Sequence, residues 1–136
     1  MSDITATVKW SETEPAAVVA TSHELDQLLH QIGACCTPGR PVIVAIYVHG
    51  YQVRIGIGLH ESFVHVERPK SDASKSCLIT YGGGQAKHGV IFYFLGTLPT
   101  EIPQHNLIPT SQARGIVREF FETGLRSTNV RWEELQ

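Results

Sequence analysis

Hydrophobic and polar positions alternate along much of the first two thirds of the chain, as in strands that bury one face. Val53, Ile55 and Ile57 alternate with Arg, Gly and Gly, which predicts a half-buried strand. The preceding run VIVAIYV, residues 42–48, is continuously apolar and is typical of a central strand covered on both faces. Gly50 lies between the two runs and permits a tight reversal, so we expect them to pair.

Other stretches rich in alternating or β-branched residues predict further strands at residues 5–10, 16–21, 62–67, 77–81 and 89–95. The turn-forming sequence SETEP separates the first two, so the second is expected to return alongside the first. The segment TEIPQHNLIP, residues 100–109, contains two prolines and is predicted to be an irregular crossing segment.

Two segments show helical periodicity instead. Thr21 and Glu24 have the spacing of a capping box, in which a hydroxyl and a carboxylate satisfy free backbone amides. Apolar residues follow at helical spacing, and Gly33 is expected to end this helix. A second helix is predicted from about 111 to 123, with Gly124 as its stop. The apolar positions of the two helices are Leu25, Leu28, Leu29, Ile32, Ala113, Ile116, Val117, Phe120 and Phe121.

The order of these elements predicts the α+β class. We expect a single curved, mostly antiparallel sheet of about five to seven strands with two helices packed on one face. The length of 136 residues suits one domain, residues 1–136, with a core of its own. Hydrophobic residues at 42% and charged residues at 18% are typical of a folded globular protein.

The net charge and the cysteine content indicate which classes of partner and which cellular compartment to expect. A formal net charge of -2 argues against an electrostatic nucleic-acid binder, so no direct nucleic-acid partner is expected. The longest apolar run, residues 41–48, is too short for a membrane span, and the start of the chain lacks the pattern of a signal peptide. Cys35, Cys36 and Cys77 form a poor disulfide framework, which favours free thiols and a cytoplasmic location.

Motifs for catalysis are weak. The sequence YGGGQAKHG, residues 81–89, lies between strand-like runs rather than before a helix, so it is interpreted as a hairpin loop and not as a phosphate loop. No serine stands in a nucleophile elbow, and no cofactor site, metal site or enzymatic activity is expected. The histidines show no metal-ligand spacing: they are His23, His30, His49, His60, His65, His88 and His105.

Two alternative classes remain open at this point. A small-ligand-binding or enzymatic α+β domain could assemble a site from residues on different strands, with Tyr47, His49, His65 and Tyr81 as candidates. A structural subunit could instead dimerise through a sheet edge. The pattern does not distinguish a monomer from a homodimer.

The last third of the chain carries a resemblance. Its matching features are EIP at 101–103, NLIP at 106–109, Ala113-Arg114, VREFF at 117–121, Thr123-Gly124 and VRWEE at 130–134. In this order and spacing the chain resembles the first family of Imm-type immunity proteins of bacterial polymorphic toxin systems. The VKW strand, the SHELDQLLHQI helix and the hydrophobic hairpin upstream fit the same plan. The loops 68–75 and 82–88 match no pattern, and loops are where partner specificity commonly lies.

The resemblance implies a function. It implies an α+β protein without catalytic activity that is the antidote to a toxin domain encoded beside it. Such toxins are often deaminase-fold enzymes that act on nucleic acid, and sometimes nucleases. The implied mechanism is stoichiometric inhibition, in which a rigid surface blocks the active site of the toxin.

The end of the chain supplies candidate partner contacts, namely Trp132, Glu133 and Glu134, and the EIP match adds Glu101. If residues 130–132 are extended, Val130 and Trp132 share one face and Glu133 points to the other. We expect Trp132 to pack on the domain and anchor the tail, with direct contact to the toxin as the alternative. The two glutamates could pair with a basic groove of the toxin, or form only a solvated acidic end.

Overall fold

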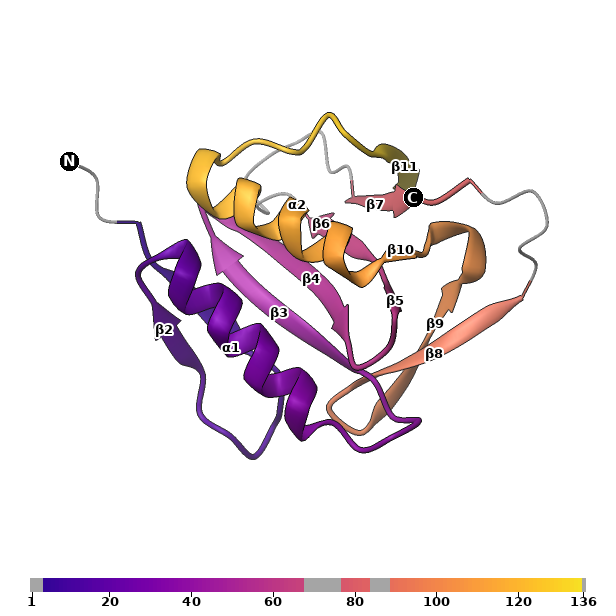
Figure 1. Ribbon diagram of the computed structural model, residues 1–136, viewed down its shortest axis with the longest axis horizontal. Helices are drawn as coiled ribbons and strands as arrows, with labels where there is room; N and C mark the ends of the chain where they lie inside the picture. Colours follow the sequence, from indigo (N-terminus) through magenta and orange to yellow (C-terminus); the bar gives the residue numbers. More distant parts are fainter. Residues whose placement is uncertain (1–3, 68–76, 84–88, 136) are drawn as a thin grey trace.

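The computed structural model describes residues 4–67, 77–83 and 89–135. Two helices, α1 (Ser22–Cys35) and α2 (Thr110–Thr123), lie on one side of a large sheet, and a short 3₁₀ helix η1 (Gln104–Asn106) precedes α2 (Figure 1). The strands are β1 (Ala6–Lys9), β2 (Ala17–Val19), β3 (Val42–Val48), β4 (Tyr51–Ile57), β5 (Glu61–Ser62), β6 (Val64–Glu67), β7 (Cys77–Tyr81), β8 (Val90–Leu95), β9 (Leu98–Pro103), β10 (Ile108–Pro109) and β11 (Arg131–Leu135). The predicted α+β class is confirmed.

The main sheet follows the order β11-β7-β6-β4-β3-β1-β2, and every neighbouring pair on this path is antiparallel. β8 and β9 form a hairpin that joins the sheet beside β3 through one parallel pair, Val42 with Phe94. β5 and β10 form a separate two-stranded sheet. The last strand, β11, therefore stands at one end of the path, next to β7.

The helix ends show which local signals decide the structure. The Glu24 amide donates to Thr21 Oγ1 (3.0 Å), and Glu24 Oε1 accepts from the Ala20 amide (3.0 Å), so the capping box is confirmed with a shifted second partner. The predicted end of α1 at Gly33 is wrong, because the helix continues to Cys35. Gly33 allows close packing instead: a Cβ there would lie 3.3 Å from Ile57 Cγ2 on β4.

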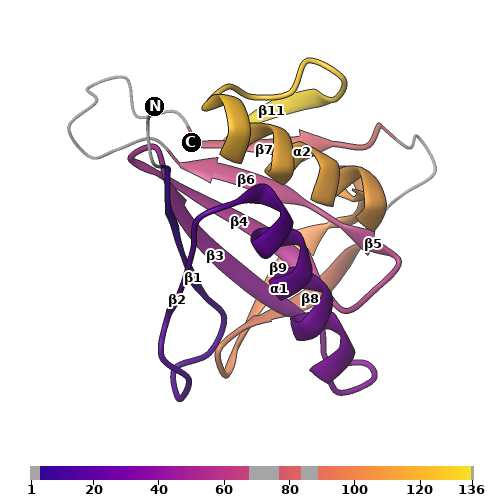
Figure 2. The same cartoon turned by 60° about the vertical axis from the view of Figure 1, so that its left-hand side comes forward.

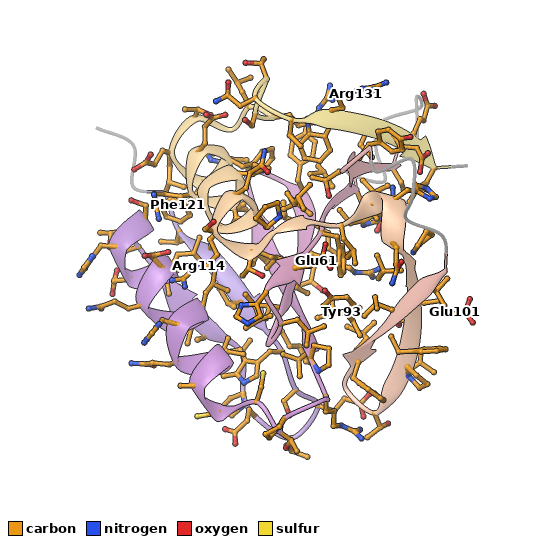
Figure 3. All side chains as sticks on the ribbon, turned by 45° about the vertical axis from the view of Figure 1, so that its right-hand side comes forward. Glu61, Tyr93, Glu101, Arg114, Phe121 and Arg131 are labelled. Atoms are coloured by element: carbon orange, nitrogen blue, oxygen red, sulfur yellow. The ribbon has the colours of Figure 1, made fainter. Side chains whose placement is uncertain are left out.

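The second helix ends as predicted. Gly124 adopts the left-handed conformation (φ 73°), and its amide donates to Phe120 O (2.8 Å). The two helices are tied together by Arg114, whose Nη2 donates to both the backbone oxygen and Oδ1 of Asp26 at 2.9 Å (Figure 3). Burial alone would raise the pKa of Asp26, but the hydrogen bonds and charges of Arg114 and Arg118 lower it overall.

The sheet buries side chains on both of its faces. The larger core lies between the sheet and the two helices, and it contains the predicted apolar residues of α2, including Phe120 and Phe121. A smaller core lies on the opposite face, beneath the β8–β9 hairpin. Figure 2 shows the helices in front of the sheet and this hairpin behind it. The members of the smaller core are Ile43, Phe63, Ile79, Tyr93, Ile102 and Leu107.

Connections between strands differ from the prediction in two places. The β3–β4 reversal is as expected, with His49 (φ 54°) and Gly50 (φ 77°) both left-handed, as a two-residue hairpin turn requires. Residues 81–89 do not join a hairpin, because β7 pairs with β6 and β11 whereas β8 pairs with β9 and β3. Residues 100–109 are more regular than predicted, since they contain the end of β9, η1 and β10. The loop 68–75 and residues 84–88 lie outside the described residues.

Candidate functional site

The sheet face opposite the helices, here called the helix-free face, is only partly covered. The strand registers place one residue from each of the seven strands of the path in a single row across this face. Directly paired residues lie on the same face of a sheet, so these side chains are neighbours. Four of them are exposed: Thr7, Val18 at 67%, Tyr47 at 46% and Leu135 at 36%. The row is Val18, Thr7, Tyr47, Gln52, Glu67, Cys77 and Leu135.

The β8–β9 hairpin covers the other part of the helix-free face, and Tyr93 holds it there. The Tyr93 ring is fully buried and fills the space left by Gly56, where a Cβ would lie 2.5 Å from the ring. Its hydroxyl donates to Glu61 O at 2.7 Å (Figure 3). Burial, together with the charge of Glu61, raises the pKa of Tyr93, so the phenol remains a donor.

A cleft of about 450 Å³ remains where the hairpin meets the uncovered part of the helix-free face. Its floor belongs to β4, β6 and β7, and β9 and β11 form its sides. Most of its walls are apolar, which is typical of sites that bury part of a partner. The apolar wall residues are Ile43, Phe63, Ile79, Ile102, Pro103 and Leu135.

Glu133 is an acidic group of this cleft that hydrogen bonds hold in place. Asn106 Nδ2 donates to Glu133 Oε1 (3.0 Å) and also to Thr80 O (3.0 Å). Thr80 Oγ1 in turn donates to Asn106 O (3.0 Å), and both residues are fully buried. His105 Nε2 lies 3.4 Å from the same carboxylate oxygen. The carboxylate is therefore held in one orientation from inside the protein.

The same contacts set the charge of this carboxylate. The hydrogen bond from Asn106 is the main cause that lowers the pKa of Glu133. Burial opposes this shift, and the hydrogen bond and charge of His105 lower the pKa further. Glu133 is ionised at neutral pH. With 38% of its side chain exposed, it presents a fixed negative charge at the mouth of the cleft.

Two basic residues lie on the floor of the cleft. His65 is neutral near pH 7, because burial lowers its pKa and the adjacent charge of Arg54 lowers it further. Within the described part of the chain, His65 Nδ1 is buried without a hydrogen-bond partner. The Arg54 guanidinium lies beside Gln52, 3.1 and 3.3 Å from the amide oxygen once that amide is oriented toward it.

The predicted contact residues are divided between the two faces. Glu101 lines the cleft from β9, and its side chain points away from the sheet (Figure 3). Glu133 and Glu134 do not form one acidic pair: Glu133 faces the cleft, whereas Glu134 is exposed on the helix side, opposite Leu78. The reason is the alternation of side chains along β11, and a contact of both glutamates with the toxin stays a prediction.

Trp132 lies on the helix side as well. With Val130 it packs, half-buried, against the larger core, so the expected shared face of these two residues is confirmed. The indole Nε1 donates to Ser127 O (3.0 Å). Trp132 thus fastens the end of the chain to the domain and is directed away from the cleft.

The residues of the alternative ligand site are not brought together. Of the four, His65 alone lines the cleft. Tyr47 is exposed in the outer row, and His49 lies at the β3–β4 turn with Nε2 2.9 Å from Phe121 O. The Tyr81 ring lies near the His105 ring at a tilt of 54°, with centroids 5.6 Å apart.

Sequence reasoning missed the groups that orient Glu133, which are Asn106 and His105. Both belong to the segment 100–109, where an asparagine between two prolines was the available signal in the sequence; its burial is seen only in the structure. All three cysteines are free, as expected. Among the described residues, no three His, Cys, Asp or Glu side chains are grouped so that they could share a metal ion. No helix in the described ranges is long and apolar enough to cross a membrane.

Comparison with known proteins agrees with this architecture. No curated protein matches the sequence significantly. The sequence does match the family model for Immunity protein Imm1 over residues 13–134, from the β1–β2 turn to the next-to-last residue of β11. The matched part includes both helices, the β8–β9 hairpin and every residue that lines the cleft except Leu135. The chain belongs to the Imm1 family of immunity proteins.

Proposed function

We propose that the chain neutralises a cognate toxin domain encoded beside it, acting in the cytoplasm as a one-to-one inhibitor that covers the active site of the toxin. Membership of the Imm1 family across residues 13–134 is the observation that carries this function. The helix-free face is the proposed contact surface. It offers an apolar cleft, a fixed charge and an exposed aromatic side chain, Tyr47, within one surface.

The chemistry of the face favours a toxin that acts on nucleic acid, such as a deaminase-fold enzyme or a nuclease. Such an enzyme holds its substrate in a basic groove. Glu133, ionised and oriented, and Glu101 at the outer rim provide complementary negative charge. Charge complementarity of this kind speeds association and selects the partner more than it adds affinity.

The size of the face is adequate for tight inhibition. A specific complex buries about 1,600 Å² in total, or about 800 Å² on each partner. The row of seven residues spans every strand of the main path, and the cleft lies beside it. Aromatic and apolar groups at the centre with charges at the rim are the usual arrangement of a tight interface.

Matched substitutions test the contact surface. Gln52→Arg places a cation in the middle of the exposed row, where it should repel a basic groove and weaken binding to the purified toxin domain by at least about tenfold. Gln112→Arg makes the same change on the exposed surface of α2 and should leave the affinity unchanged. Gln112→Arg should keep the wild-type melting temperature. Gln52→Arg removes the amide oxygen that accepts from Arg54, so its affinity is measured at a temperature where its own unfolding curve shows it fully folded. The reverse pattern would place the interface on the helices, and no binding by the wild-type protein would refute the function.

A further inference from the structure

We propose that the cleft receives an arginine side chain of the toxin, with the aliphatic part of that side chain along the apolar walls and its guanidinium group on the Glu133 carboxylate. This inference rests on the proposed function, because it names the group by which the toxin is recognised. It assigns the cleft one occupant and gives Glu133 the role of its receptor.

The walls of the cleft suit the carbon chain of an arginine. Ile79 on the floor, Ile102 on β9 and Leu135 on β11 line the path toward Glu133. Long cationic side chains commonly bury their methylene groups against such surfaces while the charged group stays at the edge. The half-exposed position of Glu133 at the mouth provides that edge.

The Glu133 carboxylate can accept a further hydrogen bond from a group of the toxin. Both contacts described for Glu133, from Asn106 and from His105, use Oε1. An ionised carboxylate has about four acceptor positions, so Oε2 remains suited to a guanidinium N–H within the described part of the chain. Because buried Asn106 already fixes the orientation, little side-chain entropy is lost when a partner binds.

The neighbouring groups favour arginine over other occupants. An acidic side chain would be repelled by Glu133, and a lysine ammonium is strongly hydrated and is less suited to a partly dry cleft than a guanidinium. Arg54 shares the cleft, but its guanidinium is directed to Gln52. A tyrosine phenol could donate a single hydrogen bond to Glu133, but it carries no positive charge to match the carboxylate.

Small probes test the occupant without the toxin. The isotope-labelled protein is titrated by NMR with N-acetyl-arginine amide, its uncharged isostere N-acetyl-citrulline amide, N-acetyl-lysine amide and p-cresol. We expect the arginine probe to shift the methyl signals of Ile79, Ile102 and Leu135 with a dissociation constant on the order of 10 mM. The citrulline and lysine probes should bind roughly threefold or more weakly, and about 0.5 M salt should reduce the difference from citrulline.

Variants of adjacent residues on one strand provide the control. Glu133→Gln should weaken the arginine probe by about three- to fivefold, as expected for a partly exposed ion pair. Glu134→Gln makes the same charge change on the opposite face of β11 and should have no effect. Tighter binding of p-cresol than of the arginine probe, equal binding of citrulline, or shifts only outside the cleft would overturn the inference.

The toxin complex separates this inference from the function on which it rests. Glu133→Gln should raise the dissociation constant of the complex by at least about tenfold, because the guanidinium is left without its partner in a desolvated interface. An unchanged affinity would overturn the arginine contact while neutralisation stands. A wild-type protein that binds the arginine probe but not the toxin would instead refute the proposed function.

Discussion

Gly56→Ala is a small change with a large expected effect, because it removes the space that the Tyr93 ring occupies. The added Cβ would lie 2.5 and 2.8 Å from two carbons of that ring and 3.0 Å from Phe63. Carbon atoms in contact are normally about 3.5–4.0 Å apart, so the ring must move by about 1 Å. The ring is fully buried and packs edge-on against Phe63, and its hydroxyl is hydrogen-bonded to Glu61 O, so movement of the ring disturbs both contacts.

The magnitude follows from these two contacts. Overpacking of a filled core costs about 1–3 kcal/mol, and loss of the phenol hydrogen bond adds about 1 kcal/mol. The free energy of unfolding should fall by about 2–4 kcal/mol, which is roughly 8–16 °C in melting temperature for a chain of this size. Urea unfolding monitored by circular dichroism measures the change.

Gly115→Ala is the matched control. It adds the same methyl group to α2, where a Cβ would have no neighbour within 4 Å. Alanine should stabilise this half-buried helical position, which has room for the methyl group, by about 0.5–1 kcal/mol. In the Gly56→Ala background, Tyr93→Ala should cost at least about 1 kcal/mol less than it does alone, since the clash is relieved. Equal midpoints for the two alanine variants, or strict additivity with Tyr93→Ala, would refute this account of how the hairpin is held.

Three further outcomes are expected. Trp132→Phe keeps an aromatic ring but loses the indole N–H bond to Ser127 O, and should lower the free energy of unfolding by about 1 kcal/mol in urea titrations; an unchanged midpoint would contradict the anchoring role. Asp26, whose pKa is lowered in the folded state, contributes stability above its unfolded pKa of about 3.9 that is lost as pH falls through the folded value. Lowering the pH below about 4 should therefore lower the melting temperature of the wild type more than that of Asp26→Asn, which already lacks the charged bond to Arg114. NMR titration should give His65 a pKa below 6.5, because burial disfavours its charged form, and a value above 6.5 would show that the floor of the cleft is wet or paired with an acid.

The helix ends that were predicted correctly are those set by residues close to them in the sequence. The capping residues Thr21 and Glu24 defined the start of α1, and Gly124 defined the end of α2, because each acts within one turn of its own helix. The prediction that α1 ends at Gly33 was wrong because the role of this glycine depends on a distant contact. A glycine that ends a helix and a glycine that allows close packing look alike in sequence, and only the contact with Ile57 on a distant strand decides between them.

The site could be predicted only in part, since its contacts join distant segments. Glu101 and Glu133 were identified as candidates from the family pattern, and both line the cleft. The bond from Asn106 to Glu133 spans 27 residues, and periodicity carries no information about it. Gly56 was a usable signal, because an isolated glycine in a strand often marks the close approach of another segment. It would have indicated that the second face of the sheet is covered there.

The register of β11 places both the residue that anchors the end of the chain and the carboxylate proposed to contact the toxin. β11 is held to β7 by five residue pairs, with Trp132 opposite Thr80 and Glu133 opposite Ile79. A slip of one residue would turn every side chain to the other face, so Glu133 would leave the cleft and Trp132 would leave the core. The indole has a defined place only on the helix side, where it packs and donates to Ser127 O. Trp132 therefore selects the register that places the Glu133 carboxylate within reach of Asn106, although it does not line the cleft itself.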